Sequence, residues 1–287
     1  MKLKYFQKGM NFSQDGPGNR LVYHLQGCNL RCPWCANPEG IAVGGCLTAG
    51  SELNGDFCPR GAISGSEVDF SVCRSCSKPC LDSPASGMKM SCVEEEISDI
   101  VAFCESCKMM FFGGGGVTVS GGEPTVQAEG LREFFTLLGE KGINRALECN
   151  CTYCDMESVS ELTDFLICDC KHYDSDLHKE VCGSPLDTIF ENIGMLSRTR
   201  EQLLIRIPLI GSFNAREGDA ERFAELFGGI CTDACSFEFL RYHEFGKNKY
   251  ARCGMNYTMG KDAFVPPETV EKFTRIFREH SLNVIHT

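Results

Sequence analysis

The chain has 287 residues, of which 43% are hydrophobic, and its formal net charge is −11. This length suffices to bury a full core, either as one domain with an insertion or as two domains. An acidic chain without a basic stripe is a poor candidate for nucleic-acid binding. No apolar run approaches the roughly 18 residues of a membrane span, and the N-terminus lacks the apolar region of a secretion signal. We therefore expect a cytoplasmic protein that binds neither nucleic acid nor membrane.

Short apolar segments typical of strands alternate with helical patterns along most of the chain. Leu131, Phe134 and Leu138 lie at helical spacing, and so do Phe273 and Phe277. This alternation predicts an α/β fold with a parallel sheet. Six or so such units suggest a barrel, complete or partial, although an open doubly wound sheet fits the same periodicity. The predicted strands are 21–26, 117–120, 145–148, 166–169, 203–208 and 237–240, with a short last one at 283–286.

One segment breaks this alternation. Between residues 41 and 92 there is little helical period and much Gly and Ser, and cysteines recur. We interpret it as an inserted cysteine-ligated minidomain, preceded by the first part of the main fold (1–40) and followed by the remainder (93–287), which starts with a helix near Val93. The chain has 20 cysteines in all. A disulfide scaffold would suit a small domain in an oxidising compartment, whereas closely spaced cysteines in a reducing cytosol more often bind metal.

Three of these cysteines, Cys28, Cys32 and Cys35, directly follow the first predicted strand. Parallel α/β sheets place their chemistry in the loops after the strands, so this is a favourable position for a site. Three thiolates in one tight loop can hold three irons of a [4Fe–4S] cluster and leave the fourth iron without a protein ligand. A zinc loop is the alternative, but zinc sites usually pair two Cys-x2-Cys units, and no matching second pair lies nearby.

With this triplet, the chain resembles the radical S-adenosylmethionine (SAM) superfamily and, more narrowly, the activating enzymes of glycyl-radical enzymes. The resemblance covers most of the chain outside 41–92. It also rests on the motif Asp15-Gly16-Pro17-Gly18 within 12–20 and on the Gly-Gly-Glu-Pro turn within 114–124. Three later segments carry it further: 169–172 (Asp-Cys-Lys-His), 206–210 (Arg-Ile-Pro-Leu-Ile) and 240–250. The fold that the resemblance implies is a partial (β/α)6 barrel with an inserted ferredoxin-like minidomain.

The resemblance also implies a SAM site. The Gly-Gly-Glu turn would bind the methionine amino group, because glycines let backbone carbonyls approach and a carboxylate complements an ammonium. Lys171 would meet the methionine carboxylate, and Asp169 would help to hold a monovalent cation. For Lys171, an ordinary solvated lysine is the alternative. The SAM-binding residues implied in this way are Trp34, Ala36, Asn37, Gly121, Gly122, Glu123, Asp169, Cys170, Lys171 and His243.

Many members of this group carry two copies of Cys-x2-Cys-x2-Cys-x3-Cys-Pro, in which the fourth cysteine of each copy ligates the other copy's cluster. By that rule Cys58, Cys73, Cys76 and Cys80 complete one auxiliary [4Fe–4S] cluster, with one residue inserted before Cys80. A second auxiliary cluster would need other ligands. Electron relay to the SAM cluster is the role we expect, and a purely structural staple is the alternative. The candidates for the second cluster are Cys46, Cys92, Cys104 and Cys107.

Cys149, Cys151, Cys154 and Cys170 stand where the family tends to have other residues. Free cysteine usually behaves as a small buried residue, so burial is the simpler interpretation. Altered metal chemistry is the alternative. Cys182, Cys231, Cys235 and Cys253 are expected to be structural.

The reaction implied by the resemblance is reductive cleavage of SAM to a 5′-deoxyadenosyl radical, which abstracts hydrogen from a backbone glycine of a partner enzyme. No side-chain acid or base is required, because the cofactors carry the chemistry. We expect a monomer that accepts electrons from flavodoxin or ferredoxin. The alternatives are a radical SAM enzyme acting on a small molecule or tRNA, and a non-catalytic iron–sulfur electron carrier.

Overall fold

The computed structural model describes residues 1–10 and 14–286. Over this range the main sheet has nine strands in the order β13-β12-β11-β10-β9-β8-β2-β1-β7. From β2 through β8 to β13 every neighbouring pair is parallel, whereas β1 runs antiparallel to both β2 and β7. The strands are β1 (Lys2–Met10), β2 (Arg20–Leu25), β7 (Val93–Glu96), β8 (Gly116–Gly121), β9 (Asn144–Cys149), β10 (Phe165–Asp169), β11 (Leu203–Leu209), β12 (Cys235–Arg241) and β13 (Asn283–Val284).

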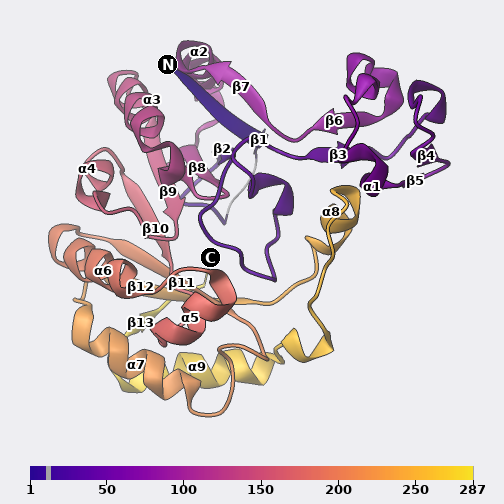
Figure 1. Cartoon of the computed structure of the whole chain (residues 1–287). Helices are drawn as coiled ribbons and strands as arrows, with labels where there is room; N and C mark the ends of the chain where they lie inside the picture. Colours follow the sequence, from indigo (N-terminus) through magenta and orange to yellow (C-terminus); the bar gives the residue numbers. More distant parts are fainter. Residues whose placement is uncertain (11–13, 287) are drawn as a thin grey trace.

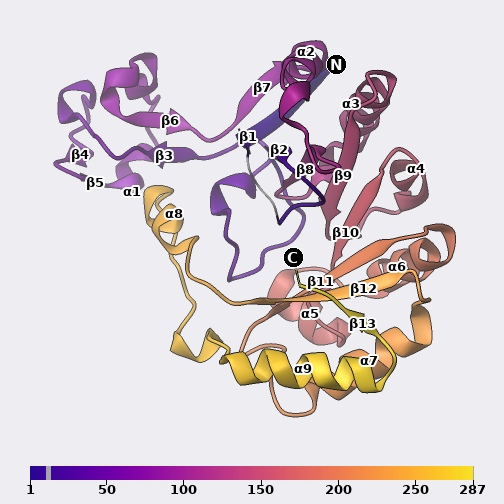
Figure 2. The same cartoon turned by 180° about the vertical axis from the view of Figure 1, so that it is seen from behind.

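Helices follow each of the six strands β2 and β8–β12, which makes six β/α units. In Figures 1 and 2 the larger helices form an arc around the outer side of the curved sheet, and the loop after β2 lies on its inner side. The sheet stays open because β7 and β13 are its edges. The helices are α2 (Ile97–Ser106), α3 (Ala128–Glu140), α4 (Met156–Ser160), α5 (Ser175–Cys182), α6 (Asp187–Thr199), α7 (Asp219–Ile230), α8 (Lys247–Arg252) and α9 (Pro267–Glu279).

The core lies between the sheet and this arc of helices. Strands covered on both faces read as nearly continuous apolar runs, and β11 is buried at six of its seven positions. Phe134 of α3 and Phe277 of α9 are fully buried, as their helical spacing predicted. Phe277 contacts Phe237 and Phe239 of β12 with ring centroids 5.2 and 4.8 Å apart. The expected α/β fold with an incomplete barrel is therefore confirmed.

Two elements at the sheet edge differ from the sequence expectation. The helix expected near Val93 begins at Ile97, and residues Val93–Glu96 form β7. β1 was not predicted at all, and β7 pairs with it. Lysines of β1 neutralise the glutamates of β7; Lys2 Nζ, for example, lies 3.5 Å from Glu94. These cross-strand charges stabilise a strand whose own sequence, Val-Glu-Glu-Glu, has little strand propensity.

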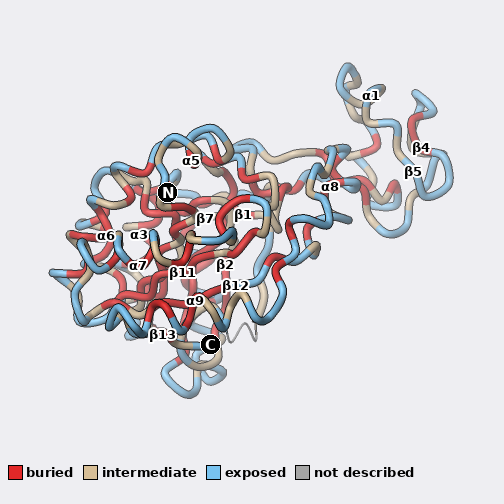
Figure 3. The backbone as a smooth tube through the Cα atoms, turned by 90° about the horizontal axis from the view of Figure 1, so that it is seen from below, coloured by how far each residue is buried: buried red, intermediate tan, exposed pale blue. Residues whose placement is uncertain are grey.

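The segment predicted as an insert projects from the sheet (Figures 1 and 2), and its residues are less buried than those of the main body (Figure 3). Two short hairpin-like sheets pair β3 with β6 and β4 with β5. They surround a small apolar cluster centred on Leu47, Ile63 and Met88. The elements are β3 (Leu47–Ala49), β4 (Ile63–Ser64), β5 (Glu67–Val68), α1 (Phe70–Cys73) and β6 (Met88–Met90).

Short 3-10 turns connect many of these elements: η1 (Pro38–Gly40), η2 (Gly55–Phe57), η3 (Pro79–Asp82), η4 (Pro84–Ser86), η5 (Lys108–Met110), η6 (Pro124–Gln127) and η7 (Lys261–Ala263). Among the described residues, no helix is long and apolar enough to cross a membrane. All 20 cysteines are free thiols in this structure.

Candidate active site

The loop after β2 brings Cys28, Cys32 and Cys35 to one side of a cavity of about 260 Å³. Backbone N–H groups donate to two of the sulfurs, from Leu30 to Cys28 and from Asn37 to Cys35, each at 3.4 Å. Burial raises the pKa of both thiols, and these bonds oppose the rise because they favour the thiolate. The three sulfur atoms do not all lie within 4.8 Å of one another, as the ligands of a single ion would. This arrangement fits ligands of separate irons in a cluster.

The cavity joins residues from the ends of six strands. Its floor and sides combine thiols, carboxylates, one lysine and aromatic rings, so it can hold a charged organic molecule. Trp34, at its edge, packs on Phe213 with ring centroids 4.9 Å apart. The lining residues are Cys28, Leu30, Cys32, Trp34, Cys35, Ala36, Asn37, Ser120, Gly121, Gly122, Glu123, Glu148, Cys149, Asn150, Asp169, Lys171, Pro208, Ile210, Leu240, Arg241, Tyr242 and His243.

The Gly-Gly-Glu turn after β8 lies against the cysteine loop. Gly121 has a φ of 128°, and a Cβ on Gly122 would collide with the backbone oxygen of Gly27. Only glycines permit this close approach. Glu123 N–H donates to the same Gly27 oxygen at 2.7 Å, which fixes the turn to the loop.

The Glu123 carboxylate is buried and already bound by the protein. One oxygen accepts from Thr125 N–H at 3.0 Å and from the Thr125 hydroxyl, and the other accepts from Asn150 N–H at 2.7 Å. Burial raises its pKa, although these bonds oppose the rise. Glu123 therefore caps η6 and anchors the loop after β9, and lone pairs remain for one further donor in the cavity.

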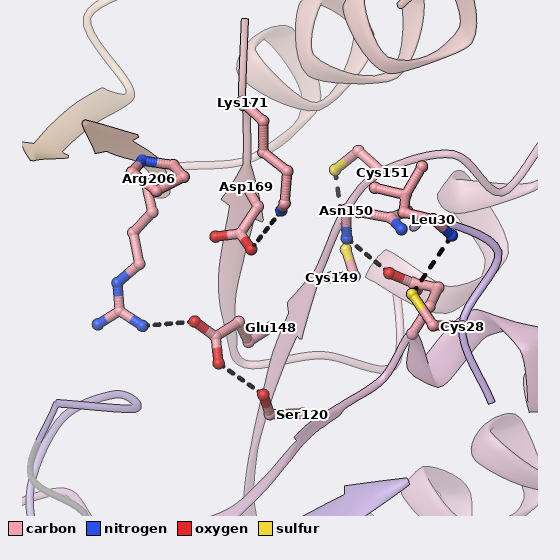
Figure 4. A network of polar contacts seen from close by, with 12 residues as sticks. Cys28, Leu30, Ser120, Glu148, Cys149, Asn150, Cys151, Asp169, Lys171 and Arg206 are labelled. Carbon is pink, nitrogen blue, oxygen red and sulfur yellow. Dashed lines mark hydrogen bonds and ion pairs between the residues drawn. The ribbon is translucent and has the colours of Figure 1, made fainter. Parts of the chain in front are cut away.

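Lys171 and Asp169 form an ion pair at the end of β10, with Nζ 2.8 Å from Oδ2 (Figure 4). Burial disfavours the ammonium, but Asp169 and the nearby Cys32 outweigh it, so the pKa of Lys171 is raised. The lysine is therefore a permanent cation in the cavity wall, not an ordinary solvated one. Asn214 holds its backbone, because its side-chain amide donates to Lys171 O at 2.8 Å.

A second charge network lies beside it. Arg206 of β11 is almost fully buried and pairs with Glu148 at 2.7 Å (Figure 4). It also pairs with Glu238 at 2.8 Å. Burial would raise the pKa of Glu148, but Arg206 reverses this and lowers it. Asp15 lies 3.7 Å from Arg206, and burial, together with Glu148, raises its pKa to about 7. The Asp-Gly-Pro-Gly motif thus places its aspartate in this network; Phe12 and Ser13 of the same segment lie outside the described residues.

α8 packs against the end of the cysteine loop through Lys249. Lys249 donates to Asn37 Oδ1 at 2.6 Å and lies 3.0 Å from Glu39, so the helix is tied to the end of the cysteine loop. His243 precedes α8 and stacks on exposed Phe245 with ring centroids 4.2 Å apart. His243 is thus a solvent-accessible wall of the cavity.

Cys170 is the one implied SAM-binding residue that the structure does not bring to the cavity wall. Its side chain is fully buried, and its thiol donates to the backbone oxygen of His172 at 3.3 Å. Sequence reasoning missed Ser120, Glu148 and Asn150, which do line the cavity. Glu148 ends a predicted strand and Asn150 follows it, and this position at a strand end could have indicated that both lie in the site.

Two further thiol groups lie near the cavity. Cys182, at the end of α5, contacts the thiol of Cys32, and its carbonyl accepts from Arg31 N–H at 2.8 Å. Behind the cavity, Cys149 and Cys151 have sulfurs 3.7 Å apart (Figure 4). Both sulfurs and that of Cys168 lie within 4.8 Å of one another.

The four cysteines assigned to the first auxiliary cluster are neighbours. Burial raises the pKa of Cys73, and the other three, Cys58, Cys80 and Cys76, add to the rise by their proximity. Cys76 accepts an N–H bond from Lys78 at 3.4 Å. Lys78 has a φ of 59°, so the residue inserted before Cys80 is accommodated by a left-handed turn.

The four candidates for a second auxiliary cluster lie in different surroundings. Cys46 contacts Cys253 where the projecting segment joins α8. Cys92 packs near Gly45, next to Cys46 in the chain. Cys104 belongs to the main core beside Tyr23, and Cys107 ends α2.

Comparisons with known proteins show the family of the chain. The model of the radical SAM superfamily matches residues 22–224. The isethionate sulfite-lyase activating enzyme of Desulfovibrio desulfuricans is 31% identical, with 89% of each chain aligned. The (2S)-3-sulfopropanediol dehydratase activating enzyme of Klebsiella oxytoca is 30% identical over 93% of this chain and 90% of its own. Streptococcus suis SuiB, solved with its precursor peptide SuiA, is similar in fold alone: TM-score 0.53, 13% identity, 92% of this chain and 47% of SuiB.

The chain belongs to the radical SAM superfamily. Within that superfamily it is an activating enzyme of the group that acts on glycyl-radical enzymes. Its activity is that of a radical SAM oxidoreductase, and the family implies a [4Fe–4S] cluster and SAM as cofactors. The resemblance drawn from the motifs is thereby confirmed.

Proposed function

We propose that Cys28, Cys32 and Cys35 hold the [4Fe–4S] cluster that binds SAM, and that this chain uses it to activate one particular glycyl-radical enzyme. The observation that carries the proposal is that the three cysteines share one cavity with the Gly-Gly-Glu turn, Lys171 and His243. When bound, the reduced cluster and SAM supply a 5′-deoxyadenosyl radical. The partner's backbone glycine gives up its Cα hydrogen to that radical, which becomes 5′-deoxyadenosine.

The donor set of the cavity fits these cofactors. Lys171 supplies a fixed cation for the methionine carboxylate and, from the same position, offsets the negative charge of the cysteine thiolates. The backbone oxygens of the Gly121–Glu123 turn and the remaining lone pairs of Glu123 suit the amino group. Trp34, Ala36, Asn37 and His243 enclose the rest of the ligand. Cys170 does not line the cavity, so we leave it out of the proposed SAM contacts.

A monovalent cation at the back of the cavity is part of the proposal. Asp169 and Glu148 both line the cavity, and Ser120 donates to Glu148 at 2.6 Å. Carboxylate and hydroxyl oxygens are the ligands that hard cations prefer. Asp169 is the residue that the family resemblance assigns to this role, and Glu148 is its natural companion.

We further propose that residues 41–92 form a separate iron–sulfur unit, between main-fold segments 1–40 and 93–287. Cys58, Cys73, Cys76 and Cys80 would hold one auxiliary [4Fe–4S] cluster, which relays electrons from flavodoxin or ferredoxin. The proximity of these four thiols and the small apolar cluster of this segment support the assignment. A staple needed only for folding is the competing role. No comparable grouping supports a second auxiliary cluster from Cys46, Cys92, Cys104 and Cys107.

The partner would dock at the open mouth of the cavity. Leu240 and Arg241 line this mouth, and Phe245, next to it, is 79% exposed. Exposed apolar side chains of this kind suit a protein segment better than they suit water. We propose that the activase is a monomer in the cytoplasm when it meets its partner there.

To test this function, the anaerobically reconstituted protein is incubated with dithionite, SAM and the glycyl-radical enzyme that is encoded nearest to it. We expect 5′-deoxyadenosine and an electron paramagnetic resonance doublet on the partner. A small molecule or tRNA as the true target would give 5′-deoxyadenosine without the doublet. An intact cluster that forms no 5′-deoxyadenosine would leave only the electron-carrier function.

Iron counts near eight per chain support one auxiliary cluster, and counts near four contradict it, because each cluster holds about four irons.

A further inference from the structure

Three thiols converge directly behind the cavity, in a place that the proposed function does not use. Cys149 ends β9, Cys168 lies on β10, and Cys151 is in the loop after β9. Their sulfur atoms all lie within 4.8 Å of one another, and the Cys149 and Cys151 sulfurs are 3.7 Å apart. At a Zn–S distance of about 2.3 Å, sulfurs bound to one ion lie roughly 3.8–4 Å apart. The separation thus fits ligands of one ion with little movement.

The backbone of Cys151 gives an independent reason to regard this group as a site. Its φ is 56°, in the left-handed region that β-carbon-bearing residues avoid. Asn192 of α6 holds the loop in this conformation, because its side-chain amide donates to the backbone oxygens of Cys151 and Tyr153, both at 2.8 Å. A glycine would adopt this turn without strain, yet the chain has a cysteine whose thiol joins the group.

We propose that Cys149, Cys151 and Cys168 bind a single zinc-class metal ion. Soft thiolates select zinc or copper(I) among the common ions. Three thiols that bind Zn²⁺ release three protons and form a complex of charge −1, whereas copper(I) would leave −2. Because all three residues are at least 97% buried, the ion that leaves the smaller net charge is favoured.

The location gives the ion a positioning role at the SAM site. Cys149 also lines the cavity, and Asn150, between two of the ligands, donates its N–H to Glu123 and its side-chain amide to Asn29 of the cysteine loop. An ion bound here would fix β9, β10 and the loop after β9 to one another, and through Asn150 it would hold Glu123 in place. Figure 4 shows Cys149, Asn150 and Cys151 side by side next to the cysteine loop.

The test uses holoenzyme reconstituted with iron and sulfide, incubated anaerobically with equimolar zinc and passed through a desalting column. Zinc and iron per chain are then measured by mass spectrometry. Cys151→Gly removes one ligand and suits the left-handed backbone, so it should fold; Cys168→Val removes another with little change in volume. Cys154→Ser is the matched control, because Cys154 is exposed and only three residues away from Cys151.

We expect about one zinc per chain in the wild type and in Cys154→Ser, and a loss of about tenfold or more in Cys151→Gly and Cys168→Val, with iron unchanged in all four. Wild-type protein that retains no zinc overturns the proposal, and so does a Cys151→Gly variant that retains as much as the wild type. Either result would mean that the three thiols pack as small apolar side chains. Iron retention shows that each variant is folded, so the result does not depend on the activity of the enzyme.

Discussion

The two walls of the cavity differ in how their polar groups are paired. The front wall, residues 28–37, is a loop whose sulfurs stand apart and are supported by backbone N–H groups. The back wall, formed by Glu148, Cys149, Asp169 and Lys171 at the ends of β9 and β10, pairs its polar groups with one another. Arg206 completes it from behind by pairing with Glu148.

This difference separates two tasks. In the front wall, the Cys28 and Cys35 sulfurs accept backbone N–H bonds and Cys32 contacts the thiol of Cys182, so little internal pairing has to be broken when a cofactor binds. A back wall of paired charges is already arranged before the substrate arrives, so little reorganisation is needed on binding. Changes in the front wall should therefore cost cofactor and activity with little effect on the fold, and changes in the back wall should cost stability or affinity.

The largest effect is expected in the front wall. Cys35→Ser should lower the iron content by about four atoms per chain and abolish 5′-deoxyadenosine formation, since the cluster loses one of three ligands. The matched control is Cys182→Ala, because Cys182 contacts Cys32 but is not a proposed ligand. Iron analysis and chromatography of the SAM products provide the measurements. Loss of four irons from Cys182→Ala would mean that the front wall has a fourth ligand.

Behind the back wall, Arg206→Met should destabilise the fold by about 3–5 kcal/mol, because it leaves Glu148 and Glu238 as buried charges without their cation. Lys247→Ala breaks an exposed ion pair with Glu244 and should cost less than about 1 kcal/mol. Urea unfolding under anaerobic conditions compares the two. Equal midpoints would contradict the claim that the buried Arg206 network stabilises the back wall.

Lys171→Met should weaken SAM binding by about 10- to 100-fold, since a hydrogen bond to a charged group contributes about 1.5–3 kcal/mol. Lys171→Arg retains the positive charge and should lose less. Equilibrium binding of SAM to the reconstituted, unreduced protein measures both. An unchanged dissociation constant for Lys171→Met would mean that the lysine pairs with Asp169 and does not contact SAM.

The smallest effect concerns pH. The pKa of Asp15 is raised to about 7, above its ordinary value near 3.9 in an unfolded chain. Between these values the folded chain binds more protons than the unfolded one, so this carboxyl lowers stability as the pH rises. Asp15→Asn should gain about 1–3 kcal/mol relative to wild type between pH 5 and pH 8. If the difference in unfolding free energy between Asp15→Asn and the wild type stays constant from pH 5 to pH 8, the raised pKa of Asp15 is contradicted.

The front wall was predictable from sequence because its ligands lie within eight residues and follow a recognisable strand. Much of the back wall was not. Glu148 and Arg206 are 58 residues apart, and only the parallel pairing of β9, β10 and β11 brings them together. The left-handed turn of Cys151 leaves no trace in composition, since cysteine does not favour it. β1 and β7 were missed because their stability comes from each other's charges.

The central claim is that the radical made in this cavity takes its hydrogen from a glycine of another protein. The most direct measurement supplies the partner enzyme with deuterium at its glycine Cα and analyses the 5′-deoxyadenosine by mass spectrometry. The account predicts one deuterium in the product, formed only when the partner is folded and present. Unlabelled 5′-deoxyadenosine, formed at the same rate with and without the partner, would contradict it.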